Sequence, residues 1–285
     1  MSDEARKGGN PGAGAGRDEW GETPRARPDV ADQERPVIAR VHDFIVGGIH
    51  HRLVDREFAH ELVTTVPGID EVIRELLVFR PRVVAHLASL GVDQYLDLGS
   101  GLPTVRPTHE VAASGGVRPR VVYVDNDPEA VEPARELLRG RDGVRVLAGD
   151  VGEPGSWLPA VAEHLDLRRP VAVIASAVLH YVDDDAATVT LRALHAATAP
   201  GSPLAIATLS GRGRPEPQAW TRYDHGGVSY PPRLREPEHM VGWLEGYDVA
   251  PPGWVAATHW EADAARAPTP NEAGTSYWGV VARRR

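Results

Sequence analysis

The spacing of apolar residues predicts a chain that begins with helices and continues as alternating strands and helices. The first helical run stops at Gly47-Gly48, the second covers residues 53–66 and the third covers residues 70–90. In each run apolar residues recur every three or four positions, as they do on one face of a helix. Pro81 lies inside the third run. We expect a kink or a break there, because proline removes one backbone hydrogen bond.

Six short apolar runs typical of β-strands follow, and helix-length segments separate most of them. They cover residues 95–98, 121–124, 144–147, 171–175, 204–208 and 277–282. Their apolar character is continuous rather than alternating, which is typical of strands that are covered on both faces. Strands that alternate with helices in this way predict an α/β fold with a doubly wound, mostly parallel sheet.

The local composition divides the chain into three parts. Residues 1–34 are rich in Gly, Pro and charged side chains and are expected to form a disordered tail. Residues 35–90, which contain the three helices, are expected to form a cap or lid. Residues 91–285 are expected to form the α/β domain. Within that domain, residues 211–237 are rich in Pro, Gly and Arg, which predicts an irregular insertion that is either flexible or lid-like.

The overall composition excludes several classes of protein. Apolar residues make up 42% of the chain, enough for a folded core. The absence of cysteine excludes disulfides, thiolate metal sites and cysteine nucleophiles. The formal net charge of −9 argues against a nucleic acid or an anionic membrane surface as partner. Because no run is long and apolar enough to span a membrane and no secretory signal is recognised, the expected location is the cytoplasm.

Ligands of doubly wound sheets bind at the carboxyl ends of the strands, so the residues after each predicted strand carry the functional signal. Asp97-Leu98-Gly99-Ser100-Gly101 ends the first strand, and its two glycines let the backbone turn sharply and approach a ligand. The third glycine of a dinucleotide-binding loop is missing. A carboxylate at Asp97 repels phosphates but suits a ligand with an ammonium or sulfonium group. An ordinary strand–helix turn is the alternative.

Two more carboxylates follow the next two strands. Asp125 ends the second predicted strand and can accept hydrogen bonds from both hydroxyls of a ribose. Capping of the next helix is the alternative, but Asp127 is better placed for that role before Pro128. Asp150 ends the third strand and could accept a hydrogen bond from an adenine amino group, or lie solvated in a loop. We expect the three carboxylates to converge on one nucleoside that carries a cationic sulfur.

These motifs resemble those of the class I S-adenosylmethionine-dependent methyltransferases. The resemblance rests on the glycine loop, on Asp125 and Asp150, and on residues 176–180 after the fourth strand. A narrower resemblance, to the actinobacterial S-adenosyl methyltransferase family that was once a domain of unknown function, covers roughly residues 36–283. The segments that carry it are residues 39–48, 55–57, 101–104, 109–112 and 123–128.

The resemblance implies a Rossmann-like sheet of seven strands with an antiparallel edge pair. It implies S-adenosylmethionine as the cofactor, S-adenosylhomocysteine as its product and an unidentified small molecule as the acceptor. The residues that it assigns to cofactor binding are Asp97, Gly99, Ser100, Gly101, Asp125, Asn126, Asp150, Val151 and Ser176. The residues that it assigns to the substrate or lid region are His42, Asp43, Gly47 and Gly48.

The chain departs from the family pattern at three places in the cap. A tyrosine usually stands at the position of His42, a lysine at that of Ile49, and an Asn-Arg pair at that of Leu76-Leu77. All three departures lie outside the cofactor motifs. The substrate can therefore differ from that of relatives even if the cofactor is the same.

Methyl transfer from an activated donor needs chiefly an aligned acceptor and the exclusion of water. A base helps only where the acceptor must lose a proton. His180, after the fourth strand, is the first candidate for a catalytic base, and a half-buried structural histidine is the alternative. His42 and Asp43 are weaker candidates that could equally form a helix-surface pair. Aromatic side chains in the insertion could line an acceptor pocket or lie loose: Trp220, Tyr223, His225 and Tyr230.

No metal site is expected, because the 12 histidines include no His-Glu-x-x-His motif. The acidic run Asp183-Asp184-Asp185 is better explained as the cap of the helix that follows it. Three functions stay open: a small-molecule methyltransferase, a protein that uses or binds the same cofactor without methyl transfer, and an NAD-dependent oxidoreductase. Asp97 and the missing third glycine argue against the last of these.

Overall fold

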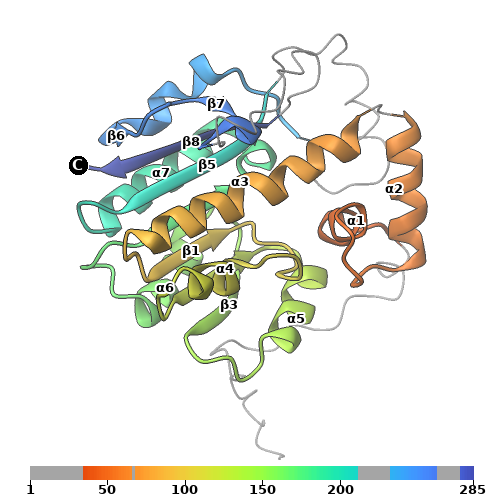
Figure 1. The fold of residues 1–285 in the computed structure, drawn as a ribbon, viewed down its shortest axis with the longest axis horizontal. Helices are drawn as coiled ribbons and strands as arrows, with labels where there is room; N and C mark the ends of the chain where they lie inside the picture. The colour runs from red at the N-terminus through yellow and green to blue at the C-terminus, as the bar shows by residue number, and fades with distance from the viewer. Residues whose placement is uncertain (1–34, 66–67, 211–231, 262–276) are drawn as a thin grey trace, which may run out of the picture.

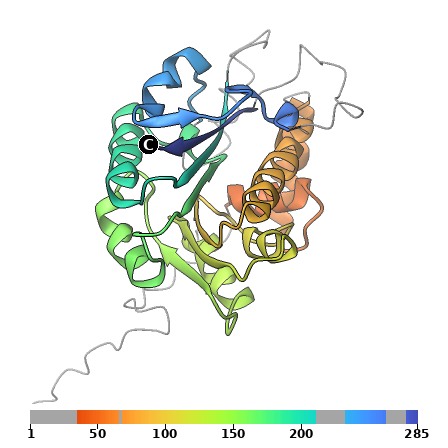
Figure 2. The ribbon, with the colours of Figure 1, turned by 60° about the vertical axis from the view of Figure 1, so that its left-hand side comes forward.

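A central sheet lies between two layers of helices in the computed structural model, which describes residues 35–65, 68–210, 232–261 and 277–285 (Figure 1). Figure 2 shows the two helical layers on either side of the strands. The α/β class that the alternation of strands and helices predicts is confirmed.

The sheet is mostly parallel and changes direction at one edge. Its strands are Gln94–Leu98 (β1), Arg120–Asp125 (β2), Val144–Ala148 (β3), Ala172–Ser176 (β4), Pro203–Leu209 (β5), Tyr247–Val249 (β6), Val255–Ala256 (β7) and Tyr277–Arg284 (β8). Seven of them follow the order β3-β2-β1-β4-β5-β8-β6, and the short β7 pairs with β8. β1 to β5 are parallel, whereas β8 runs antiparallel to β5 and β6. The expected seven strands and antiparallel edge are confirmed.

Helices cover both faces of this sheet. They are Ile38–Ile45 (α1), Leu53–Thr65 (α2), Ile69–Ser89 (α3), Thr108–Ser114 (α4), Pro128–Leu137 (α5), Pro154–His164 (α6) and Asp184–Ala197 (α7), with 3₁₀ helices Leu179–Tyr181 (η2), Pro237–Leu244 (η3) and Ala257–His259 (η4). The layer with α3, α4 and α5 packs on one face, and α6 and α7 pack on the other (Figure 2). α1 and α2 extend from the first layer at the carboxyl end of the strands.

Alternation along β1 decides which layer each of its side chains meets. Tyr95 belongs to the apolar core under α3 and α4, whereas Leu96 and Leu98 belong to the core under α6 and α7. Asp97 lies two residues after Tyr95 and therefore points to the same face of the sheet. There Thr108 at the start of α4 donates a hydrogen bond to its carboxylate at 2.6 Å.

Two helices begin at the aspartates that the sequence predicts as caps. The side chain of Asp127 accepts a hydrogen bond from the backbone of Glu129 at the start of α5. Asp183 does the same for Ala186 at the start of α7. Both caps satisfy amide groups that have no partner inside the helix, and they leave Asp125 available for another role.

The break expected at Pro81 is not found, because α3 continues through it from Ile69 to Ser89. Proline leaves the carbonyl of the residue four positions earlier without its helical donor. Here that carbonyl belongs to Leu77, and the Arg106 guanidinium reaches it at 3.5 Å. Pro81 is itself buried, so packing against the sheet layer favours the continuous helix.

Two predicted segments lie wholly or mostly outside the described residues. They are the tail at residues 1–34 and most of the insertion at residues 211–237. The four aromatic candidates of that insertion lie outside the described residues as well: Trp220, Tyr223, His225 and Tyr230.

Candidate functional site

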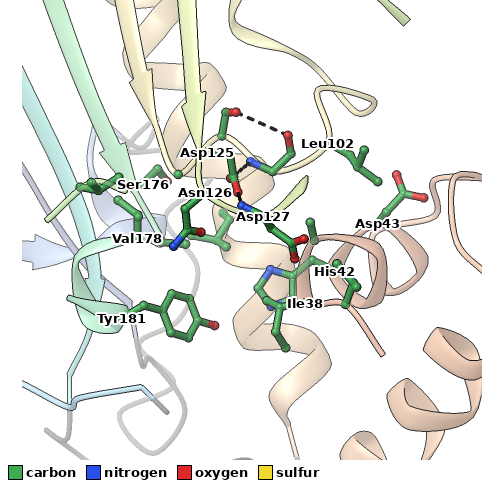
Figure 3. Close-up of a pocket in the computed structure, with 18 of the residues that line it drawn as sticks. Ile38, His42, Asp43, Leu102, Asp125, Asn126, Asp127, Ser176, Val178 and Tyr181 are labelled. Atoms are coloured by element: carbon green, nitrogen blue, oxygen red, sulfur yellow. Dashed lines mark hydrogen bonds between the residues drawn. The ribbon is translucent and has the colours of Figure 1, made fainter. Parts of the chain in front are cut away.

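A cavity of about 880 Å³ lies at the carboxyl ends of β1 to β4 and is bordered on its other side by α1 and α3 (Figure 3). The strand order reverses here, since β2 and β3 lie on one side of β1 and β4 lies on the other. Such a switch point is where α/β sheets bind ligands. The volume is near the upper end of the roughly 300–1,000 Å³ typical of small-molecule sites, so a nucleoside leaves room for a second molecule.

The glycine loop after β1 forms one wall of the cavity. Gly99 and Gly101 have φ of 60° and 57°, a backbone region that favours glycine. A Cβ atom added at Gly99 would lie 2.2 Å from Cγ2 of Val178, so the loops after β1 and β4 approach closely only because this residue is glycine. Gly99, Ser100 and Gly101 all line the cavity, as expected.

Asp125, the last residue of β2, presents its carboxylate between the glycine loop and the start of α5. It accepts hydrogen bonds from the amides of Gly101 at 2.8 Å and Asp127 at 3.0 Å. Burial raises the pKa of Asp125 to about 6, and these two amides oppose the rise. A carboxylate with a raised pKa at a cavity wall is typical of a functional site.

Asp150 lies on the same wall, beyond the end of β3. Its carboxylate accepts a hydrogen bond from the amide of Gly152 at 2.8 Å, and the side-chain amide of Asn126 lies 3.5 Å from it. Asn126, Asp150 and Val151 all line the cavity, together with Ser176 at the end of β4. The structure thus brings the residues after β2, β3 and β4 together around one space.

Asp97 differs from this expectation, because it does not line the cavity. Its carboxylate is buried below the glycine loop, where it accepts the hydrogen bond from Thr108. Burial raises the pKa of Asp97, while the Arg80 charge and the Thr108 hydroxyl oppose the rise. Two of the three predicted carboxylates therefore face the cavity, and the third supports the loop from beneath.

His180 also lies away from the cavity, although it is the first candidate for a base. The residue is fully buried, and neither ring nitrogen has a hydrogen-bond partner among the described residues. Burial, together with the neighbouring His42 and Arg235, holds the pKa of His180 well below its usual value. Its neighbour Tyr181 lines the cavity and directs its hydroxyl into it (Figure 3). Successive side chains of a 3₁₀ helix point about 120° apart, so only one of the two can face the ligand.

Asp43 joins α1 to the loop that follows β1. Its two carboxylate oxygens accept hydrogen bonds from the hydroxyl of Thr104 and from the amide of His50 at 2.7 Å. A Cβ atom at Gly48 would lie 2.1 Å from the Asp43 carboxylate, so the tight turn after α1 requires glycine there. Asp43 lines the cavity, whereas Gly47 and Gly48, which were expected in the lid, do not. Their role in the structure is to close the turn that holds Asp43.

His42 lines the cavity from α1, one residue before Asp43 (Figure 3). Burial lowers the pKa of its imidazole to about 4. The ring is therefore neutral at neutral pH, with one nitrogen as acceptor and the other as donor.

A buried ionic network that the sequence did not reveal joins α1 and α2 to α5. The guanidinium of Arg40 in α1 binds the Asp55 carboxylate in α2 at 2.7 Å and the Glu129 carboxylate in α5. Arg40 and Asp55 are only 4% and 0% exposed. Arg52 adds a second cation to Glu129 at 3.1 Å. The separations of 15 and 89 residues leave no local pattern in the sequence by which these pairs could be found.

The positions that depart from the family pattern divide into two groups. His42 and Leu76-Leu77 line the cavity, whereas Ile49 is 82% exposed. Sequence reasoning also missed Ile73 and Arg80, which line the cavity from α3. Their signal was the helical spacing of residues 73, 76, 77 and 80, which puts them on one face of α3.

The described residues contain no group of three or more metal-binding side chains arranged around one point. None of the described helices combines the length and the apolar character that crossing a membrane requires.

Comparison with known proteins places the chain in a family. The chain matches the model of the S-adenosyl methyltransferase family over residues 24–285. It is 33% identical to a proposed methyltransferase from Thermobifida fusca YX, with a TM-score of 0.82 over 91% of this chain and 98% of that chain. It is 32% identical to a DUF574 family protein from Streptomyces avermitilis MA-4680, with a TM-score of 0.81 over 89% of this chain and 99% of that chain. No curated protein matches the chain.

Proposed function

This chain belongs to the S-adenosyl methyltransferase family, whose cofactor is S-adenosylmethionine, and we propose that its cavity aligns this cofactor with a small-molecule acceptor. The observation that carries the proposal is the pair of carboxylates at the ends of adjacent strands, Asp125 and Asp150, beside a glycine loop on one cavity. The net charge of −9 and the concave shape of the site favour a small molecule over a nucleic acid.

The residues on the cavity wall fit an adenosine. We assign the ribose hydroxyls to the carboxylate of Asp125, which is acceptor-only when ionised. We assign the adenine edge to Asp150 and Val151, and the region near the methionine part to the glycine loop and Ser176. Because the amide of Gly101 donates a hydrogen bond to the Asp125 carboxylate, the glycine loop and this carboxylate are already held together before the ribose binds.

When bound, S-adenosylmethionine supplies a methyl group that is already activated on a sulfonium sulfur. The protein then has to orient the acceptor and exclude water, which needs no catalytic triad. α1 and α3 cover the cavity opposite the strand ends and provide this enclosure.

Binding of S-adenosylhomocysteine, followed by transfer of a labelled methyl group, tests the proposal. We expect a rise of the melting temperature with S-adenosylhomocysteine and none with NAD, because a ligand stabilises only the state that binds it. Incubation with methyl-labelled cofactor and candidate metabolites then identifies the acceptor. A shift with NAD alone would contradict the assignment of the cavity.

Arg80 is expected to bind the carboxylate of the cofactor's methionine part. It lines the cavity, and within the described ranges no carboxylate lies within ion-pair distance of it. Its guanidinium donates a hydrogen bond to the carbonyl of Val105 at 3.4 Å. Arg80→Met should weaken S-adenosylhomocysteine binding about tenfold, the effect of one lost charge-assisted hydrogen bond. Methylthioadenosine, which lacks the amino-acid part, should bind equally well to both proteins by calorimetry.

Arg74→Met is the matched control, because Arg74 lies on the same helix and pairs with Asp70 at the surface. It should change neither affinity. If Arg80→Met weakens both ligands to the same degree, the residue acts on the fold of the site and not on the carboxylate.

Binding should also depend on pH through Asp125. Its pKa of about 6 in the free protein means that the carboxyl becomes protonated as the pH falls through 6. A protonated carboxyl can no longer accept from two hydroxyls, so the affinity for S-adenosylhomocysteine should fall by up to about tenfold per pH unit below 6. Calorimetry between pH 5 and 8 measures this slope. A flat profile would show that Asp125 does not have to ionise for binding.

A further inference from the structure

The cavity continues from the strand ends into a space between α1 and α3 that is walled by apolar side chains. These side chains are Ile38, Val46, Ile73, Leu76 and Leu77. The adenosine assigned above occupies the opposite end, beside Asp125 and Asp150. An apolar wall of this kind recognises a molecule by the area that it removes from water.

His42 is a polar group in this apolar region whose ring has no hydrogen-bond partner among the described residues. No hydrogen bond joins its ring to any side chain or backbone group in the described part of the chain, and Figure 3 shows the ring in the same space as the Tyr181 hydroxyl. Asp43 beside it is different, because its carboxylate holds two segments in place through Thr104, in the loop after β1, and His50, after α1. His180 has no access to the cavity. Of the candidate bases, His42 alone both faces the cavity and is uncommitted among the described residues.

We propose that the space between α1 and α3 is the acceptor site, and that it takes an apolar aromatic compound whose phenolic hydroxyl donates a hydrogen bond to His42. The proposal rests on the proposed methyl transfer, and it adds the class of acceptor and the group that receives its proton.

A phenol fits this site better than the other common acceptors. An ammonium group would have to lose its hydration among five apolar side chains, and the desolvation of a charge costs free energy. An aliphatic alcohol holds its proton too tightly, whereas a phenol has a pKa near 10. The Tyr181 ring adds an aromatic surface on the η2 side of the cavity (Figure 3).

The atoms of the step balance without a further reactant. The phenolic oxygen forms a bond to the methyl carbon, the carbon–sulfur bond breaks with its electron pair left on sulfur, and the phenolic proton passes to an imidazole nitrogen of His42. The positive charge thereby moves from sulfur to the imidazole. Because burial lowers the pKa of His42 to about 4, the imidazolium returns its proton to water at neutral pH and the base is regenerated.

Calorimetry with 2-naphthol and its methyl ether tests the proposal on the complex with S-adenosylhomocysteine. The ether has the same ring but cannot donate a hydrogen bond. We expect the wild-type complex to bind 2-naphthol about three- to tenfold more tightly than the ether, which is the effect of one hydrogen bond. In His42→Phe this preference should disappear while the ether still binds. His60→Phe, the same change at an exposed position on α2, should keep the preference.

A second variant tests the site itself. Leu76→Asp places a charge in the apolar wall and should abolish the binding of both naphthalene probes while S-adenosylhomocysteine still binds. With labelled cofactor, His42→Phe should lower transfer to 2-naphthol by about 10²-fold or more, as expected for loss of a base.

Each failure has a separate meaning. If the wild-type complex binds neither probe, the acceptor class is wrong. If His42→Phe keeps the preference for 2-naphthol, the role of His42 is wrong. If S-adenosylhomocysteine itself does not bind, the proposed function fails before the acceptor site is reached.

Discussion

Replacing Arg40 by Met is expected to lower the free energy of unfolding by about 3 kcal/mol. This is the lower end of the range for breaking one side of a buried ion pair. The loss is large because the Asp55 carboxylate, which has no exposed surface, would lose its cationic partner. It stays at the lower end because the amides of Val37 and Arg52 still donate to Asp55, at 2.9 and 2.7 Å. The melting temperature should fall by roughly 6–12 °C in a protein of this size.

Denaturant unfolding of two further variants separates the charge from the packing. Arg40→Met combined with Asp55→Asn should recover much of the lost stability, since the buried carboxylate is then neutral and its oxygen still accepts a backbone hydrogen bond. Arg118→Met removes an arginine that also pairs with an aspartate, but both partners are at least 80% exposed. It should change the stability by less than about 1 kcal/mol. Equal losses in Arg40→Met and in the double variant would mean that lost packing, not an unpaired charge, explains the effect.

Features that depend on neighbouring residues were predictable from the sequence. The caps at Asp127 and Asp183 need only an acidic residue before a helix, and both are found. The continuous apolar runs became strands such as β5, in which every residue is buried. The two glycines after β1 both adopt positive φ, as the sharp turn predicted.

The place of each carboxylate relative to its strand end decides which of them faces the cavity. Asp125 is the last residue of β2, and Asp150 lies after the end of β3 at Ala148. Asp97 is still inside β1, because Leu98 follows it in the strand. Within a strand the pleat fixes the direction of a side chain, and here it turns Asp97 toward α4. The strand predicted at residues 95–98 already contains Asp97, whereas Asp125 and Asp150 follow the strands predicted at 121–124 and 144–147, so this difference could be read from the sequence.

Contacts between distant segments explain the other differences. Nothing near Arg40 indicates that Glu129 will meet it from 89 residues away. The choice between His180 and Tyr181 depends on the phase of one 3₁₀ turn, which packing against Tyr277 and the loop after β4 sets. Both are tertiary effects, and a pattern along the chain does not contain them.

Replacing Asp125 by Ala should weaken S-adenosylhomocysteine binding by about 1–3 kcal/mol, or roughly 5- to 150-fold. The variant loses the acceptor for the ribose hydroxyls, and it also loses the bond that holds the amide of Gly101. Calorimetry should show the same loss for methylthioadenosine, which keeps the ribose, and none for free adenine. This pattern distinguishes Asp125 from Arg80, whose replacement should affect only the ligand with a carboxylate.

Asp125→Asn separates the role of the charge from that of the shape. Asn keeps the size of the side chain and one acceptor oxygen, so the loop can stay in place while the negative charge is removed. We expect an affinity between those of wild type and Asp125→Ala, without the fall below pH 6. An affinity equal to that of wild type at pH 8 would refute the assignment of the ionised carboxylate to the ribose.

The same variant, unlike Arg40→Met, should not lower the stability of the fold. The folded protein raises the pKa of Asp125 to about 6, above the value of about 3.9 in an unfolded chain. The fold therefore binds this proton more tightly than the unfolded chain does, and its stability falls as the pH rises between about 4 and 6. Above pH 6 the ionised carboxylate is a cost to the fold, so Asp125→Asn should leave the melting temperature unchanged or raise it. A carboxylate that lowers the stability of the fold but strengthens ligand binding has its role in binding. Measuring the effect of Asp125→Asn on the melting temperature and on the affinity decides whether Asp125 is such a carboxylate.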